Sequence, residues 1–159
     1  MATTSITPDL DAIVAEIEVG APAERVFRAL IDPKQLLRWW TSDVCPMQVW
    51  EFDARRGGKW RFETSNSGGK LVVNGVSEFK TEGEVLEYDP LKLLAYTWIA
   101  NWHDKPSRKT QVRWELTPAG KGTRVKVTHS GLAEETVARK DYSGGWVGVL
   151  GSLKQHFEP

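Results

Sequence analysis

The sequence contains little that could cross-link or anchor a fold. Its single cysteine, Cys45, cannot form an internal disulfide, and its three histidines are scattered rather than set at the spacing of metal ligands. No run of about 18 apolar residues is present, and the N-terminal segment is acidic, unlike a secretory leader. We therefore expect a cytoplasmic protein with no metal site and no membrane insertion.

Net charge is absent as well. Lysine and arginine together number 21, as do aspartate and glutamate, so the formal net charge is zero. A protein that neutralises several phosphates is expected to carry a basic excess, which argues against nucleic acid as a partner. The glycine spacings of phosphate-binding loops, GxxxxGK and GxGxxG, do not occur, so no nucleotide or other cofactor is expected.

Length and aromatic content are the informative features. A chain of 159 residues suits one domain, with a core expected over about residues 11–157 and a flexible N-terminus over residues 1–10. A fold of this length buries about 68–70% of the surface that its unfolded chain exposes, which allows both a core and a cavity. The eight tryptophans are large side chains whose placement needs an explanation.

The first part of the chain predicts one strand and two short helices. Apolar residues alternate along residues 11–19, which is typical of a strand with one buried face. Pro22 precedes a helix expected over residues 23–31, because proline suits the first helical turn. Asp32 and Pro33 give the same start signal for a second helix over residues 33–40.

The remaining chain predicts antiparallel strands followed by one helix. Alternation and turn residues place strands at residues 49–53, 59–64, 76–88, 93–100, 111–116 and 123–129. Apolar residues at helical spacing predict a closing helix within residues 134–157. Four glycines weaken this helix, so we expect either a start near Gly144 or a close approach of its backbone to the sheet.

This order of elements predicts an α+β domain. A curved antiparallel sheet of about seven strands is expected to wrap around the long C-terminal helix, with two short helices after the first strand. One helix cannot fill the concave side of such a sheet. A mostly apolar cavity is therefore expected between the helix and the sheet.

Short motifs carry a resemblance to a known family. Residues 23–30 (AERVFRAL), Asp32-Pro33 and residues 36–40 (LLRWW) resemble the opening of the activator of heat-shock-protein-90 ATPase family, in the START/Bet v 1-like superfamily. Further matches follow in order and bring the resemblance to residues 13–153: Gly57-Gly58, GEVLE (83–87), YTW (96–98), GTRV (122–125), HSGL (129–132) and Gly144-Gly145-Trp146. The resemblance implies a helix-grip fold in a superfamily associated with lipids and polyketides, and it implies a heat-shock chaperone as a partner to test.

Side chains that face inward are the candidate ligand-binding residues. They are expected to line the cavity and stack against a hydrophobic guest, and the alternative is that they form an ordinary core. His129 would supply a base or a hydrogen bond, unless it is a structural histidine at a strand end; His103 and His156 are given no role. The candidates are Trp40, Trp60, Phe62, Tyr96, Trp98, Val112, Trp114, Val127, His129, Trp146 and Leu150.

Three functions stay open at this point. The first, which we favour, is binding of a small hydrophobic or aromatic molecule, such as a lipid, without catalysis. The second is a cochaperone-like interaction with a heat-shock chaperone in a stress response, which the resemblance implies. The third is a cyclase or hydrolase of hydrophobic substrates with His129 as its polar centre; no GxSxG motif or glycosidase-like carboxylate pair is found. Both a monomer and a homodimer are compatible with the sequence.

Overall fold

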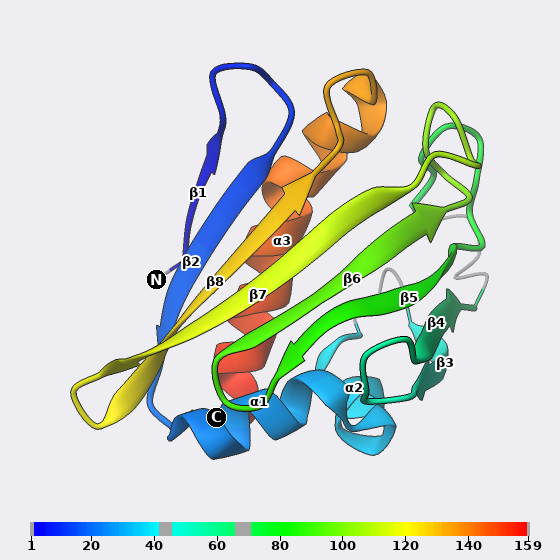
Figure 1. Ribbon diagram of the computed structural model, residues 1–159. Helices are drawn as coiled ribbons and strands as arrows, with labels where there is room; N and C mark the ends of the chain where they lie inside the picture. Colours follow the sequence, from blue (N-terminus) through cyan, green and yellow to red (C-terminus); the bar gives the residue numbers. More distant parts are fainter. Residues whose placement is uncertain (1, 42–45, 66–70, 159) are drawn as a thin grey trace.

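The computed structural model describes residues 2–41, 46–65 and 71–158, in which eight strands form one antiparallel sheet (Figure 1). The strand order across the sheet is β1-β2-β8-β7-β6-β5-β4-β3. The strands are β1 (Thr3–Ile6), β2 (Ile13–Val19), β3 (Met47–Phe52), β4 (Lys59–Thr64), β5 (Lys80–Asp89), β6 (Leu93–Ala100), β7 (Thr110–Ala119) and β8 (Gly122–Ser130). The helices are α1 (Ala23–Ile31), α2 (Pro33–Trp39) and α3 (Thr136–Phe157).

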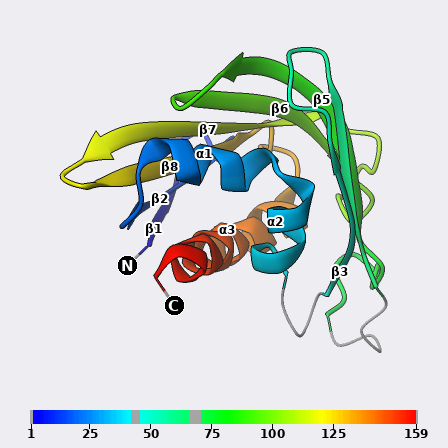
Figure 2. The ribbon, with the colours of Figure 1, turned by 90° about the horizontal axis from the view of Figure 1, so that it is seen from below.

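The sheet bends around the C-terminal helix, as the view in Figure 2 shows. Helix α3 lies on the concave side, α1 and α2 cross one end of the sheet, and strands β3 to β5 turn downward to form a side wall (Figure 2). The predicted class is confirmed: an α+β domain whose curved antiparallel sheet wraps around a long C-terminal helix.

Alternation along the strands separates the core from the outer face. In β2, Ile13, Ala15, Ile17 and Val19 are buried, and the residues between them are at least partly exposed. Strand β2 pairs with β8 so that Ile13 lies opposite His129 and Ala15 lies opposite Val127. Because the side-chain period of a strand is two, this register keeps the apolar side chains of both strands on the concave face.

The short helices begin where the prolines predict. Pro33 opens α2, and the side chain of Asp32 accepts a hydrogen bond from the backbone N–H of Lys34 at 3.0 Å, which satisfies one free donor of the first turn. The indole N–H of Trp39 donates to the carbonyl of Ala29 at 2.9 Å. This bond joins the two helices and fixes the point at which Trp40 leaves α2.

Helix α3 runs without a break through its glycines. Both expectations about them are wrong: the helix begins at Thr136, and a Cβ placed on Gly144, Gly145, Gly148 or Gly151 would meet no atom within 4 Å. The helix forms because a buried stripe, Ala138, Tyr142, Trp146, Leu150 and Leu153, recurs every three or four residues and packs on the sheet. That packing offsets the cost of glycine, which is about 1 kcal/mol per residue relative to alanine.

One strand was not expected from the sequence, and two strand boundaries differ from the expectation by three or more residues. The eighth strand is β1, which lies within the first ten residues and pairs with β2 from Thr3 opposite Glu16 to Ile6 opposite Ile13. All four of its residues are exposed, so it has no apolar alternation to detect. Strand β5 begins at Lys80 rather than at residue 76, and β7 continues to Ala119 because Pro118 lies opposite Thr123 in a hairpin with β8.

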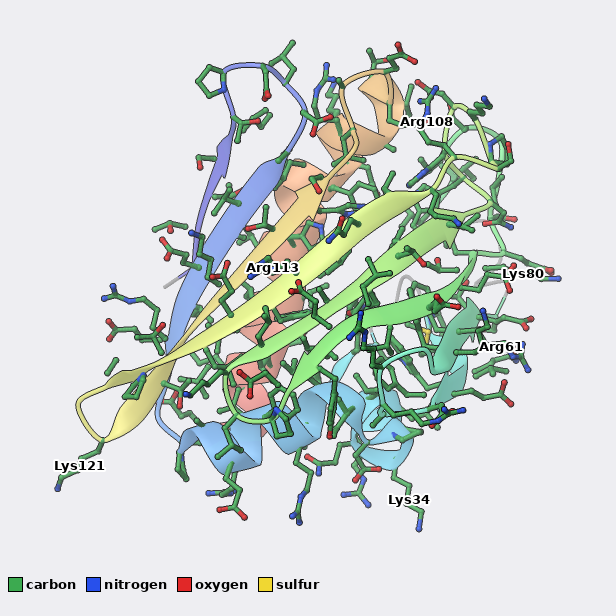
Figure 3. The ribbon with its side chains drawn as sticks, viewed as in Figure 1. Lys34, Arg61, Lys80, Arg108, Arg113 and Lys121 are labelled. Carbon is green, nitrogen blue, oxygen red and sulfur yellow. The ribbon has the colours of Figure 1, made fainter. Side chains whose placement is uncertain are left out.

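The convex face of the sheet carries paired charges. Arg113 lies on the side turned away from α3 (Figure 3) and forms ion pairs with Glu87 and Glu115. Arg124 pairs with Glu18 across β8 and β2 at 2.8 Å. Among the described residues, no helix has the length and apolar composition needed to cross a membrane.

Candidate functional site: a tryptophan-lined cavity

A cavity of about 360 Å³ lies between α3 and the side wall of the sheet. Trp40 and Thr41 close it at the end of α2, and residues of β3, β4 and β6 and of the segments that follow β4 and β6 form its walls. The exposed Gly145 and Gly148 of α3 border it, so the cavity opens to solvent along this helix. The described lining residues are Trp40, Thr41, Met47, Phe62, Thr64, Leu71, Val73, Phe79, Trp98, Trp102, Asp141, Tyr142, Gly145, Trp146, Gly148, Val149 and Ser152.

Three tryptophans from different elements meet in the wall of the cavity. The ring centroids of Trp40 and Trp98 are 6.2 Å apart, those of Trp40 and Trp146 are 5.7 Å apart, and those of Trp98 and Trp146 are 5.5 Å apart. Phe62 lies edge-on to Trp98 at 5.5 Å. The Trp40–Trp98 pair is stacked and the other pairs are tilted or edge-on, all favourable arrangements of aromatic rings, so these side chains pack well against one another while they border the cavity.

The structure divides the predicted site residues into two groups. Four of them line the cavity: Trp40, Phe62, Trp98 and Trp146. The other seven are buried in the core and do not border it: Trp60, Tyr96, Val112, Trp114, Val127, His129 and Leu150. Their polar tips find partners within the protein, since Trp60 donates to the carbonyl of Thr97 at 3.0 Å and Trp114 donates to the hydroxyl of Tyr96 at 2.8 Å.

His129 is held in the core by both of its ring nitrogens. Its Nδ1 accepts a hydrogen bond from the indole N–H of Trp146 at 3.2 Å. Its Nε2 lies 2.8 Å from the hydroxyl of Thr110, and that hydroxyl donates its own proton to the carbonyl of Trp98. Nε2 therefore carries the imidazole proton, and the ring is neutral. Burial lowers the pKa of His129 well below its usual value, so it holds Trp146 in place rather than facing the cavity.

A second buried histidine connects the cavity wall to a carboxylate. The hydroxyl of Tyr142 accepts from the indole N–H of Trp98 at 2.8 Å and lies 2.8 Å from Nε2 of His103. On its other side, Nδ1 of His103 lies 3.9 Å from Oε1 of Glu135. A proton on Nδ1 facing the carboxylate leaves Nε2 to accept the Tyr142 proton. Burial lowers the pKa of His103 and raises that of Tyr142, so both side chains are neutral near pH 7.

Glu135 is fixed in position by several hydrogen bonds and in turn faces His103. Its carboxylate is fully buried and accepts hydrogen bonds from the backbone N–H groups of Asp104 and Lys105, and it forms an ion pair with Arg108. The side chain of Asp104 in turn accepts from the N–H of Thr136 at the start of α3. The loop between β6 and β7 is thus attached to the first turn of α3, and this attachment positions His103 and Tyr142 beside the cavity.

The described wall of the cavity carries one ionisable carboxylate. Asp141, which is partly exposed, is the one described lining residue with a charged side chain. Burial raises the pKa of Asp141. In the described part of the chain, no three His, Cys, Asp or Glu side chains gather in a way that could hold a metal ion.

Comparison with known proteins agrees with this architecture. The model of the family described as "Activator of Hsp90 ATPase homolog 1-like protein" matches residues 20–158. The chain belongs to this family. No curated protein matches the sequence.

Solved structures place this family member among the helix-grip proteins of the START/Bet v 1-like superfamily. A Chromobacterium violaceum protein is 25% identical, with a TM-score of 0.78 over 94% of this chain and 99% of that one. A Mycobacterium smegmatis protein is 17% identical, with a TM-score of 0.79 over 99% and 96%. CalU16 from Micromonospora echinospora is 20% identical, with a TM-score of 0.63 over 100% and 85%. These similarities establish the fold.

Several residues that line the cavity of this family member, or contact its wall from behind as His103 does through Tyr142, were not predicted. Trp102 and His103 lie in the loop between β6 and β7, where no strand parity indicates which side chains point inward. Asp141 and Tyr142 lie on α3, and the helical spacing from Trp146 back to Tyr142 was the available signal for the tyrosine. Cys45, the single cysteine, lies outside the described residues.

Proposed function

We propose that this protein binds a small hydrophobic or aromatic molecule in the cavity between α3 and the side wall of the sheet. The observation that carries the proposal is the unfilled space of about 360 Å³, which is bordered by four tryptophans, two phenylalanines and a tyrosine. Ligand sites in proteins are typically about 300–1,000 Å³, mostly apolar, and equipped with a few polar groups.

The glycines of α3 support this assignment. Gly145 and Gly148 border the cavity, and a Cβ on either would meet nothing within 4 Å. Alanine at these positions would favour the helix by about 1 kcal/mol and would cause no clash. The two glycines therefore lower the stability of the helix, but they leave space beside the cavity. A protein that admits a ligand needs such an opening.

A leucine at Gly148 is expected to weaken ligand binding by about tenfold or more, because its side chain would project into the entrance. The probe is N-phenyl-1-naphthylamine, a neutral molecule whose fluorescence rises when it enters an apolar site. The matched control is Gly144→Leu, since Gly144 lies one turn earlier on α3, is also exposed and has equally open surroundings, but does not line the cavity. Both variants gain helix propensity and are expected to fold.

The comparison between the two leucine variants decides the proposal. Binding that is weakened in Gly148→Leu and unchanged in Gly144→Leu supports it. If the probe does not bind the wild-type protein, or binds Gly148→Leu as tightly as Gly144→Leu, the proposed site is wrong.

A further inference from the structure

The composition of the cavity wall indicates the charge of its ligand. Asp141 is the single charged side chain among the described lining residues, and no described lysine, arginine or histidine borders the cavity. Seven of the described lining residues are aromatic, namely Trp40, Phe62, Phe79, Trp98, Trp102, Tyr142 and Trp146. The cavity therefore combines one carboxylate with an apolar, ring-lined interior.

The helix gives Asp141 no partner of its own. On an α-helix, side chains three and four residues away are the neighbours that can pair with a carboxylate. For Asp141 these are Val137 and Ala138 on one side and Gly144 and Gly145 on the other, and none of the four has a polar side chain. Among the described residues, no hydrogen bond or opposite charge offsets the desolvation of this carboxylate.

Aspartate in this setting is unfavourable without a ligand. It has a lower helix propensity than most residues, and it lies in the second turn of α3, beyond the first-turn positions where a negative charge benefits from the helix dipole. A partly buried carboxylate in the wall of a mostly apolar cavity also loses hydration. A positive charge in the cavity would supply the missing partner.

Tryptophan faces add to the attraction for such a charge. The face of an indole carries negative electrostatic potential, and a cation within about 6 Å of the ring centre is stabilised, most strongly where water is excluded. The ring centroids of Trp40, Trp98 and Trp146 lie within 6.2 Å of one another, and all three rings line the cavity. Because these rings and Asp141 line the same cavity, a ligand can pair an ammonium group with the carboxylate while its apolar part contacts the rings.

We propose that the ligand is a hydrophobic amine, whose protonated nitrogen pairs with Asp141 and whose aromatic or aliphatic body fills the tryptophan-lined space. This assignment rests on the proposed function, because it specifies the ligand class of the same cavity. It also predicts discrimination: a neutral molecule of the same shape binds less tightly, and a carboxylate is repelled by Asp141.

Three probes of similar shape test the charge preference. Isothermal titration calorimetry at pH 7 would compare 1-naphthylmethylamine, which is cationic, with neutral 1-naphthalenemethanol and anionic 1-naphthoate. The wild-type protein is expected to bind the amine about tenfold more tightly than the alcohol and to bind the carboxylate most weakly. Asp141→Asn is expected to bind the amine and the alcohol equally. The control Glu134→Gln removes the same charge from an exposed residue outside the cavity and should keep the preference.

The outcomes separate this inference from the function on which it rests. If the alcohol binds as tightly as the amine in the wild-type protein, or if Asp141→Asn retains the preference, the amine assignment is overturned while hydrophobic binding stands. If none of the three probes binds, both the assignment and the proposed function fail.

Discussion

Replacing Glu135 by alanine is expected to lower the free energy of unfolding by about 3–5 kcal/mol. The carboxylate of Glu135 is fully buried, and it accepts hydrogen bonds from the backbone N–H groups of Asp104 and Lys105 as well as pairing with Arg108. Its removal leaves two backbone donors without their acceptor and leaves the Arg108 guanidinium with only the exposed Glu134 as partner, and unpaired buried groups are costly. The measurement is urea unfolding followed by tryptophan fluorescence.

Glu134→Ala is the matched control for this variant. Glu134 precedes Glu135 in the chain and contacts the same guanidinium at 3.2 Å, but its side chain is 83% exposed. An exposed ion pair contributes about 0–1 kcal/mol, so this variant is expected to unfold almost as the wild type does. Equal losses in the two variants would show that Glu135 does not anchor the loop to α3.

Acidification from pH 7 to pH 5.5 is expected to destabilise the fold through its buried histidines. Burial lowers the pKa of His129 and of His103 in the folded state, whereas both side chains titrate near pH 6.5 when the chain is unfolded. The unfolded state therefore binds more protons in this range, and stability falls as the pH falls. The expected loss is about 1 kcal/mol per histidine for each pH unit below 6.5.

The hydrogen bonds of His129 explain why it resists protonation. A proton on Nδ1 would place an N–H against the indole N–H of Trp146, which now donates to that nitrogen. The carboxylates whose pKa values are lowered by their partners, such as Glu18 beside Arg124, lose their contribution only below about pH 4.5, outside this range.

Urea unfolding at pH 7, 6.2 and 5.5 measures how the free energy of unfolding depends on pH. Two histidine variants show which side chain causes this dependence. In His129→Gln, the change in the free energy of unfolding with pH is expected to be about half that of the wild type. His156→Gln is expected to keep most of the wild-type change, because His156 is only partly buried and faces Gln35 at the surface. A stability that does not change between pH 7 and 5.5 would contradict the assignment of neutral, buried histidines.

The sequence predicted those parts of the fold in which local pattern and tertiary environment agree. Strand β2 alternates because one face packs on the core, and α2 begins at Asp32 and Pro33 because both residues favour a first turn. Strand β1 was missed since all its residues are exposed, and its backbone pairing with β2 has no signal in the sequence.

The site was harder to predict than the fold. Strand parity correctly placed Trp60, Trp98 and Trp114 inside, but it does not show which inward side chains face a cavity and which face α1 or α3. That distinction depends on the path of α3 across the concave face. A loop has no periodicity, so the inward positions of Trp102 and His103 were not detectable.

Two expectations about protein partners stay predictions. A heat-shock chaperone as partner is not tested by the fold, and the convex face offers paired charges such as Arg113 with Glu87 rather than a field of one sign. The choice between a monomer and a homodimer is likewise a prediction that sedimentation would resolve.

The most direct test of the cavity as a binding site is an NMR titration that resolves the indole N–H signals of the eight tryptophans. With N-phenyl-1-naphthylamine, the largest shifts are expected for the four that line the cavity, Trp40, Trp98, Trp102 and Trp146. The signal of Trp39, whose indole N–H donates to the carbonyl of Ala29, is expected not to shift. Saturation of binding without movement of the four cavity signals, or with the largest shifts on the other tryptophans, would contradict the account.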